Sequence, residues 1–152
     1  MKKQHLTLVV ITMLALFSIS AALETLWTGD DIIGNWYTAE NKTVVKIYKN
    51  KSDYYFGKIT WLKNPNEDDG KAKVDKENPD PKLRNTPLLG MLILKSFKFD
   101  GDKWAGGTIY DPENGKTYKC TMKLTDNNTL DVRGYIGVSA IGRTTTWKRK
   151  TD

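Results

Sequence analysis

The sequence has almost none of the residues on which nucleophilic catalysis and metal binding usually depend. It contains one histidine, His5, and one cysteine, Cys120. A single cysteine forms no intramolecular disulfide and cannot build a thiolate zinc site. If the region around His5 is removed from the mature protein, no imidazole remains. This excludes Ser–His and Cys–His nucleophiles and every His-ligated metal site. We therefore expect neither a cofactor nor a metal ion.

Concentrated charge of either sign is also scarce. Lysine and arginine exceed aspartate and glutamate by 24 to 18, a formal net charge of +6, and the longest basic run is residues 148–150. Such a mild excess does not indicate a nucleic-acid partner, and we expect none. The acidic groups within 68–69 and 75–80 could offer oxygen ligands to calcium, but their spacing matches no known calcium loop, which favours solvated charge.

The N-terminal residues have the pattern of a cleavable export signal. Lys2 and Lys3 precede an apolar run over residues 6–17, and small residues follow as far as Ala22. The run is shorter than the roughly 20 residues that a membrane-spanning helix needs. We predict a signal peptide over residues 1–22, a single domain over residues 23–152, and a periplasmic or secreted location. An uncleaved membrane anchor is the alternative.

After the signal, short β-prone runs alternate with turn residues, and no long stretch has helical periodicity. The expected strands cover residues 33–39, 43–48, 54–62, 91–99, 103–110, 116–124, 129–135 and 143–150. Eight strands at hairpin spacing predict an all-β fold, an antiparallel up-and-down barrel, because closure removes the exposed edges of an open sheet. Two consecutive glycines, Gly106 and Gly107, are expected to bend their strand so that the barrel can close.

The longest connection, residues 63–90, holds four of the five prolines. A connection of this length in a small barrel is typically a functional lid or a disordered insertion. The prolines stiffen it and its leucines at 83, 88 and 89 offer apolar surface, so we expect an ordered lid over the open end. Arg84 is predicted to anchor this lid through a carboxylate, Asp75 or Asp111. A solvated charge at Arg84 is the alternative.

Loop lengths predict which end of the barrel is open. Connections in an up-and-down barrel alternate between its ends, and the turns at 49–52, 100–102 and 126–128 are all short. The long connections share the opposite end, which marks an open mouth above a closed floor. Alternation along the last strand then points Arg143 inward at the mouth and Arg149 inward at the floor, near Trp36.

Two sets of motifs resemble known families. Gly34-x-Trp36 at the head of the first strand resembles the opening of lipocalins and their calycin relatives. In that group the tryptophan plugs the closed end and an arginine of the last strand stacks over it, which implies these roles for Trp36 and Arg149. A denser set is similar to a bacterial family of unknown function numbered 2147; it includes Asp75-x-x-Asn78-Pro79-Asp80, Trp104-x-Gly106-Gly107-x-Ile109-Tyr110-Asp111-Pro112 and Gly142-Arg143-Thr144-x-x-Trp147-x-Arg149. This resemblance implies an exported calycin-like barrel and no particular activity.

A candidate ligand site follows from the mouth-proximal ends of the expected strands and from the lid. An eight-stranded barrel can hold one small ligand if its interior is not filled by side chains. Aromatic walls with a few polar groups suit a partly apolar molecule, and Arg143 or Arg84 could hold an anionic group on it. The predicted ligand-binding residues are Trp61, Asn78, Arg84, Tyr110, Asp111, Tyr135 and Arg143. A filled core without a cavity is the alternative.

Three classes of function remain open at this point. The first is a monomeric exported barrel that binds a small molecule, and we favour it. The second is a structural protein of the cell envelope that docks on a partner through the lid or the basic C-terminal residues. The third is a histidine-free enzyme that uses carboxylate, tyrosine and arginine groups, such as Asp111 with Tyr110.

Overall fold

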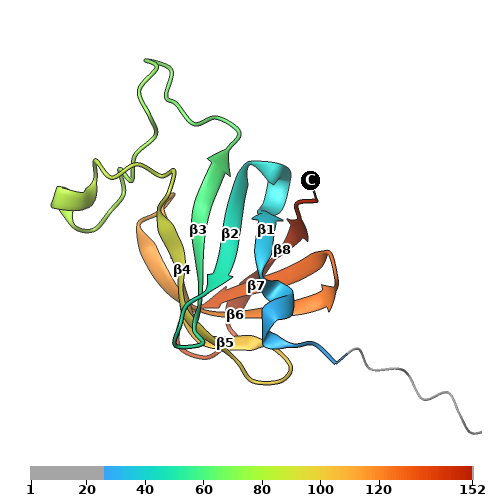
Figure 1. The fold of residues 1–152 in the computed structure, drawn as a ribbon. Coiled ribbons are helices and arrows are strands. Elements are labelled where there is room, and N and C mark those ends of the chain that lie inside the picture. The colour runs from blue at the N-terminus through green and yellow to red at the C-terminus, as the bar shows by residue number, and fades with distance from the viewer. Residues whose placement is uncertain (1–25, 152) are drawn as a thin grey trace, which may run out of the picture.

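The computed structural model describes residues 26–151, so the predicted signal peptide at 1–22 lies outside the described residues. Residues 26–151 form a closed barrel in which each strand pairs antiparallel with the next and β8 returns to β1 (Figure 1). Its strands are β1 Gly34–Tyr37, β2 Thr43–Lys49, β3 Tyr55–Leu62, β4 Leu92–Phe99, β5 Trp104–Asp111, β6 Lys116–Asp126, β7 Thr129–Tyr135 and β8 Gly142–Arg149. No helix within this part of the chain is long and apolar enough to cross a membrane.

The observed strands confirm the predicted all-β up-and-down barrel. β7 covers the predicted residues, and each of the other strands differs by one or two residues at one or both ends. The first strand is the shortest because a 3-10 turn, η2 (Ala39–Asn41), begins where the prediction continued the strand. Glu40 and Asn41 adopt positive φ angles of 66° and 53°, which an extended strand does not allow.

Large side chains fill the lower half of the barrel. Three tryptophans, Trp36, Trp104 and Trp147, lie in one core cluster with exposed fractions of 0 to 3%. β6 alternates as predicted, because Cys120, Met122 and Leu124 are buried there while the residues between them face outward. Burial of this much apolar surface provides the main driving force for folding. It also leaves the floor half of the barrel without space for a ligand.

A short 3-10 helix that the sequence patterns did not predict closes the floor. η1 (Gly29–Ile32) crosses the closed end just before β1 begins (Figure 1). The indole Nε1 of Trp36 donates to the carbonyl oxygen of Ile32 at 2.9 Å, and that of Trp104 donates to the carbonyl oxygen of Gly29 at 3.0 Å. The two indoles therefore satisfy backbone acceptors of η1 while their rings fill the core.

The glycine pair of β5 produces the predicted bend. Gly106 has a φ of +78°, and the β5–β6 register shifts between Trp104 and Gly107. A methyl group at Gly107 would come within 2.5 Å of the Phe97 ring, so the bend brings neighbouring strands into close contact across the core. Only glycine fits this approach without displacing the phenylalanine.

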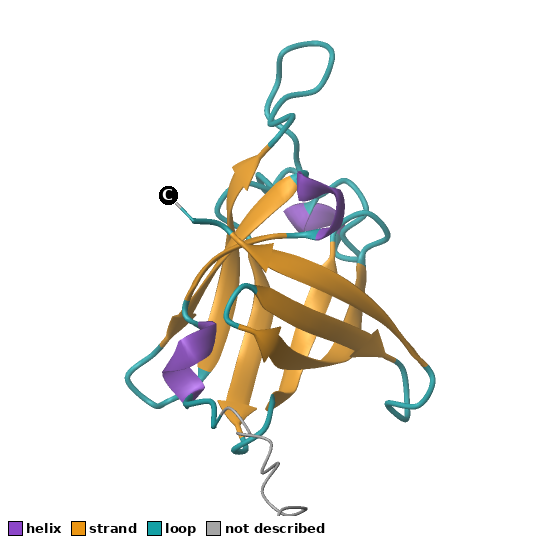
Figure 2. Cartoon of the chain, turned by 90° about the vertical axis from the view of Figure 1, so that its right-hand side faces the viewer, coloured by secondary structure: helices purple, strands orange, loops and turns teal. Residues whose placement is uncertain are grey.

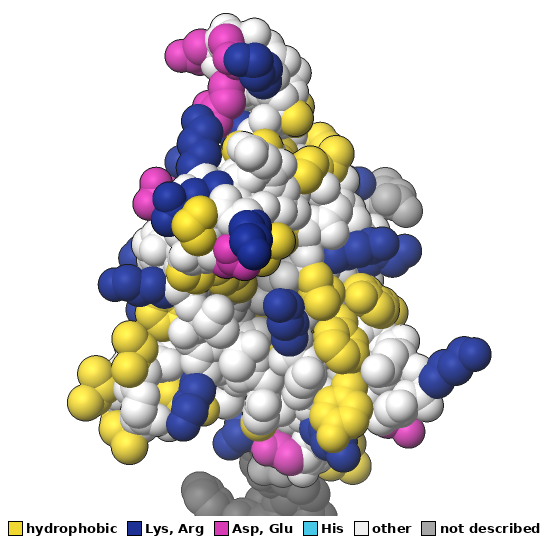
Figure 3. All heavy atoms as spheres, turned by 90° about the vertical axis from the view of Figure 1, so that its left-hand side faces the viewer, with side chains coloured by type: hydrophobic (Ala, Val, Ile, Leu, Met, Phe, Trp, Pro, Cys, Tyr) yellow, Lys and Arg dark blue, Asp and Glu magenta, His cyan; other side chains and the backbone are white. Residues whose placement is uncertain are grey.

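The connection between β3 and β4, residues 63–90, lies at the open end. Two isolated antiparallel bridges, Asn66 with Ala72 and Val74 with Pro87, give it an ordered path. Figures 2 and 3 show its tip standing clear of the barrel, and Figure 3 shows acidic and basic side chains on it. Some of these pair with each other, as Lys76 does with Glu67 at 2.7 Å. The segment is therefore ordered, as predicted, but its tip does not close over the mouth.

Candidate functional site

Inward-facing side chains change from buried to exposed toward the open end. Along β8, Trp147 is buried, Thr145 is partly exposed and Arg143 is exposed. Along β6, Cys120 is buried and Tyr118, two residues nearer the mouth, is partly exposed. The interior is thus closed at the floor and accessible at the mouth.

The strand pairing places the inward-facing side chains at the mouth on neighbouring strands. Ile109 of β5 pairs with Tyr118 of β6, and Gly134 of β7 pairs with Arg143 of β8. A methyl group built on Gly134 would lie 3.6 Å from both Ile109 and Tyr118, an ordinary contact distance, so Gly134 packs beside these two side chains. The Arg143 side chain makes no hydrogen bond or ion pair with any other residue in the described part of the chain. Its guanidinium is therefore available to an anionic group at the mouth.

A buried carboxylate holds the middle of the 63–90 segment against the barrel. Asp75 is fully buried, and both of its carboxylate oxygens lie 2.8 Å from the Tyr110 hydroxyl of β5. The amide of Asn78 donates to the same carboxylate at 2.6 Å. Burial and the hydrogen bond to Asp75 raise the pKa of Tyr110 to about 12, so it remains a donor throughout the physiological range. We call these three residues the latch.

Backbone packing supports the latch from the β5–β6 turn. Gly115 has a φ of +69°, and a methyl group there would collide with the carbonyl of Glu77, two residues beyond Asp75. Asp111 shapes the turn itself, because its carboxylate accepts the backbone N–H of Glu113 at 2.9 Å and the side-chain amide of Asn114 at 2.8 Å. Asp111 thus forms the turn and does not face Arg84.

The predicted ion pair of Arg84 is wrong. Arg84 is exposed, and its Nε donates to the backbone carbonyl of Asn78 at 2.8 Å. No ion pair links it to a carboxylate among residues 26–151. Asp75, its expected partner, satisfies its lone pairs with neutral donors of the latch. Leu83 and Leu89, which we expected to pack down, remain 49% and 53% exposed.

Two other predicted site residues lie apart from the latch. Trp61 is 44% exposed and contacts Tyr37 edge to face, with ring centroids 6.1 Å apart. Tyr135 alternates with inward-facing Gly134 and shares the outward face of β7 with Arg133. The structure therefore groups Asn78 and Tyr110 around Asp75, places Arg143 at the mouth, and leaves Trp61 and Tyr135 on the outer surface.

The floor holds the arginine contact that the calycin resemblance implies. The Arg149 guanidinium carbon lies 4.1 Å from the centroid of the Trp36 ring. Its nitrogens donate to three backbone carbonyls, those of Asp31 at 2.6 Å, Ile33 at 3.0 Å and Asn127 at 2.6 Å. Burial lowers the pKa of Arg149 from its usual value, although the group stays charged. It ties η1, the start of β1 and the β6–β7 turn into one closed floor.

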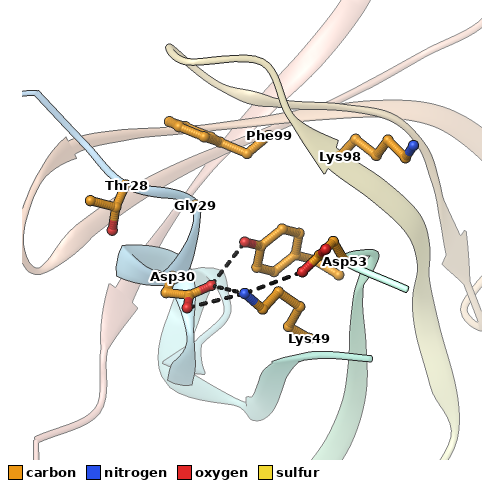
Figure 4. A pocket seen from close by; sticks show the side chains of 8 residues that line it. Thr28, Gly29, Asp30, Lys49, Asp53, Lys98 and Phe99 are labelled. Atoms are coloured by element: carbon orange, nitrogen blue, oxygen red, sulfur yellow. Dashed lines mark hydrogen bonds and ion pairs between the residues drawn. The ribbon is translucent and has the colours of Figure 1, made fainter. Parts of the chain in front are cut away.

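A groove that the sequence patterns did not predict lies beside η1. Its volume is about 630 Å³, and Figure 4 shows its labelled residues, which come from η1 and the N-cap Thr28 before it, from β2, from the β2–β3 turn and from β4. The Asp30 carboxylate accepts from Lys49 at 2.8 Å and from the Tyr55 hydroxyl at 3.0 Å, and Lys49 also lies 3.5 Å from Asp53. Lys49 thus bridges two carboxylates, and the network braces η1 against β2 and β3.

Electrostatics in this groove follow from those contacts. Hydrogen bonds from Lys49 and then Tyr55 lower the pKa of Asp30, and the Asp30 carboxylate raises the pKa of Lys49. Burial and the hydrogen bond to Asp30 raise the pKa of Tyr55 to about 12. A sequence signal was available for this region, because Thr28 and Asp31 have the spacing of a capping box. The Thr28 backbone N–H donates to the Asp31 carboxylate at 2.6 Å.

The one cysteine has no reactive environment. Cys120 is fully buried in the core, and burial raises the pKa of its thiol to about 12. The thiolate is the nucleophilic form, so a thiol with this pKa is inert near neutral pH. Cys120 acts as a small apolar core residue.

Comparisons with known proteins agree with the barrel fold. No curated protein matches the chain. A solved structure described as "Protein HP1028 from the human pathogen Helicobacter pylori belongs to the lipocalin family" superposes with a TM-score of 0.69 and is 28% identical, over 79% of this chain and 83% of that chain. A family model described as "Uncharacterized protein conserved in bacteria (DUF2147)" matches residues 34–149. The chain belongs to this DUF2147 family of bacterial proteins and has a lipocalin-like fold.

Proposed function

We propose that this protein is exported and binds a small, partly apolar, anionic molecule at the open end of the barrel. The graded exposure of the inward-facing residues carries the proposal: Trp147 is buried, while Thr145 and then Arg143 become accessible toward the mouth. A lipocalin-like barrel is suited to this role, because barrels of this size hold a ligand wherever their interior is not filled. Here the accessible part is the upper interior.

The chemistry of the mouth specifies the class of ligand. Ile109 and the ring of Tyr118 provide apolar surface, and Gly134 adds no side chain between them. Arg143 provides a planar cationic group that can bind a carboxylate, sulfonate or phosphate in a bidentate manner. The ligand therefore needs an apolar body of modest size and one acidic head group.

Binding of an aromatic sulfonate tests the proposal. The probe 8-anilinonaphthalene-1-sulfonate combines an apolar body with one anionic group, and its fluorescence rises when it leaves water. We expect saturable binding by the parent protein. Arg143→Ala should weaken this binding about tenfold, the usual effect of losing one charge-assisted hydrogen bond. Lys51→Ala, a matched loss of charge at the floor end, should leave it unchanged.

Two outcomes would contradict the proposed site. One is equal affinity of the Arg143→Ala and Lys51→Ala variants, and the other is fluorescence that rises without saturation. Native mass spectrometry of protein purified from its natural host then identifies the ligand itself. A mass excess that disappears in Arg143→Ala, produced in the same way, would tie the natural ligand to the mouth.

A further inference from the structure

The β7–β8 connection, residues 136–141, exposes three apolar side chains within one short loop. Ile136 is 70% exposed, Val138 62% and Ile141 73%. Figure 2 shows this loop projecting at the lower right, between β7 and the strand β8 that leads to the C-terminus. Single exposed apolar residues are common on soluble domains, but a projecting group of them marks an interaction surface.

Arg133 holds this loop in its outward conformation. Its Nε donates to the carbonyl of Ser139 at 2.8 Å, and Nη2 donates to the carbonyl of Ala140 at 3.2 Å. Nη1 donates to the Thr144 hydroxyl at 2.9 Å, and the backbone N–H of Ile141 donates to the carbonyl of Val138 at 3.1 Å. Three carbonyls and one N–H of the loop thus have partners within the chain, while its three apolar side chains are exposed to solvent.

The surroundings of the loop are basic. Arg133 and Arg143 lie on either side of the loop in the sequence, and no acidic residue occurs between residues 132 and 151. On the neighbouring strand, Lys119 of β6 is exposed and pairs with Tyr135, the residue that precedes the loop. A tyrosine at the base of an apolar tip, flanked by cations, is the arrangement that favours a boundary between water and lipid.

We propose that this loop docks the protein on an anionic lipid bilayer, with Ile136, Val138 and Ile141 inserted among the head groups. A protein partner fits less well, because specific protein interfaces bury about 1,000 Å² or more and three side chains provide only a small part of that area. A bilayer needs only a shallow apolar anchor and nearby cations. The hydrogen bonds from Arg133 to the carbonyls of Ser139 and Ala140 lower the cost of removing these two groups from water.

Co-sedimentation with vesicles tests this proposal. The parent and all variants are produced by the same export route, so that they share one N-terminus. We expect binding to vesicles of phosphatidylcholine and phosphatidylglycerol that weakens as salt is added, and much less binding to pure phosphatidylcholine. The variant I136S/V138S/I141S should bind at least about tenfold more weakly. The control L83S/L89S, which removes two exposed leucines from the 63–90 segment, should bind like the parent.

A charge variant distinguishes electrostatic attraction to the bilayer from insertion of the apolar side chains. Lys119→Gln should weaken binding about fivefold, since each basic residue near an anionic surface contributes about that factor. Lys51→Gln, at the floor end, should not. Near-UV circular dichroism checks that every variant keeps its tertiary fold.

Three results would overturn the proposal. Equal sedimentation of the triple variant and the parent would do so, as would no dependence on phosphatidylglycerol or on salt. If size-exclusion chromatography shows that the parent is a dimer and the triple variant a monomer, the loop binds a second copy of the chain. In that case the bilayer is not its partner.

Discussion

At the scale of single residues, the contacts of Arg149 give it a larger structural role than any other charged side chain of the floor. It stacks on Trp36 and donates to carbonyls of three segments that are far apart in the sequence. A lysine could keep the charge, but it is a point donor and could not stack as a plane while it reaches three acceptors. The planar shape of the Arg149 guanidinium therefore matters for these contacts at least as much as its charge.

We predict that Arg149→Ala lowers the free energy of unfolding by about 2–3 kcal/mol, from the lost stacking and the unsatisfied carbonyls. Arg149→Lys should recover less than half of this loss. Urea unfolding measures both, with Lys51→Ala as a surface control. An unchanged midpoint for Arg149→Ala would mean that the floor does not depend on this contact.

Two tyrosines make stability sensitive to alkaline pH. The pKa values of Tyr55 and Tyr110 are raised to about 12 from 10.0, because burial and a carboxylate partner disfavour the phenolate. A raised pKa in the folded state contributes stability that is fully present below the unfolded value and is lost as pH rises through the folded value. The sensitive window therefore lies between pH 10 and 12.

We expect the free energy of unfolding to fall steadily across that window. Tyr55→Phe and Tyr110→Phe should each reduce the slope, because each removes one group that titrates differently in the two states. Unfolding by urea at a series of pH values measures the slope, and phenolate absorbance of the folded protein reports the titration. The same slope in the double variant as in the parent would contradict this assignment.

At the scale of elements, short-range signals in the sequence were sufficient to locate the strands. Each strand is bounded by residues that favour turns, and side chains alternate between core and surface, as in β6. η1 was missed because four residues are too few for any periodicity, although Thr28 and Asp31 carry a capping pattern. The expected pairing between Arg84 and Asp75 failed for another reason. Each charged residue of a long polar loop has many potential hydrogen-bond partners. The buried Asp75 accepts hydrogen bonds from the neutral groups of Tyr110 and Asn78.

The latch gives a prediction for the 63–90 segment. Tyr110→Phe leaves the buried Asp75 carboxylate without its main donor, which costs about 1–3 kcal/mol locally. We expect faster cleavage by proteases between residues 63 and 74, with the barrel itself intact. Tyr118→Phe, which removes a partly exposed hydroxyl from the same end of the barrel, is the matched control. Arg84→Ala should leave the cleavage rate close to that of the parent, because Arg84 is exposed and its carbonyl acceptor can bind water instead.

At the scale of the whole molecule, the two ends of the barrel differ in structure. The floor is sealed by η1, by the indoles of Trp36 and Trp104 and by Arg149, while the mouth carries the long connections and an uncommitted Arg143. The latch joins the longest connection to β5, so that the mouth keeps a defined shape. This polarity of the barrel could be predicted from loop lengths alone. How far side chains fill the barrel interior could not be predicted, because this depends on how Trp36, Trp104 and Trp147 pack.

The export signal predicted over residues 1–22 bears on which surroundings the mouth and the β7–β8 loop meet, and it provides the last prediction. Small residues at Ser20 and Ala22 have the spacing that signal peptidases recognise. The first described element, η1, begins at Gly29, so cleavage after Ala22 would leave the floor and its contacts complete. We expect the exported protein to begin at residue 23 or within two residues of it. N-terminal sequencing and intact mass decide this, and Ala22→Leu should slow the cleavage because a large side chain fits the peptidase poorly. Exported parent protein that still begins at Met1 would mean that the N-terminal segment is retained as an anchor, and the periplasmic or secreted location would then be wrong.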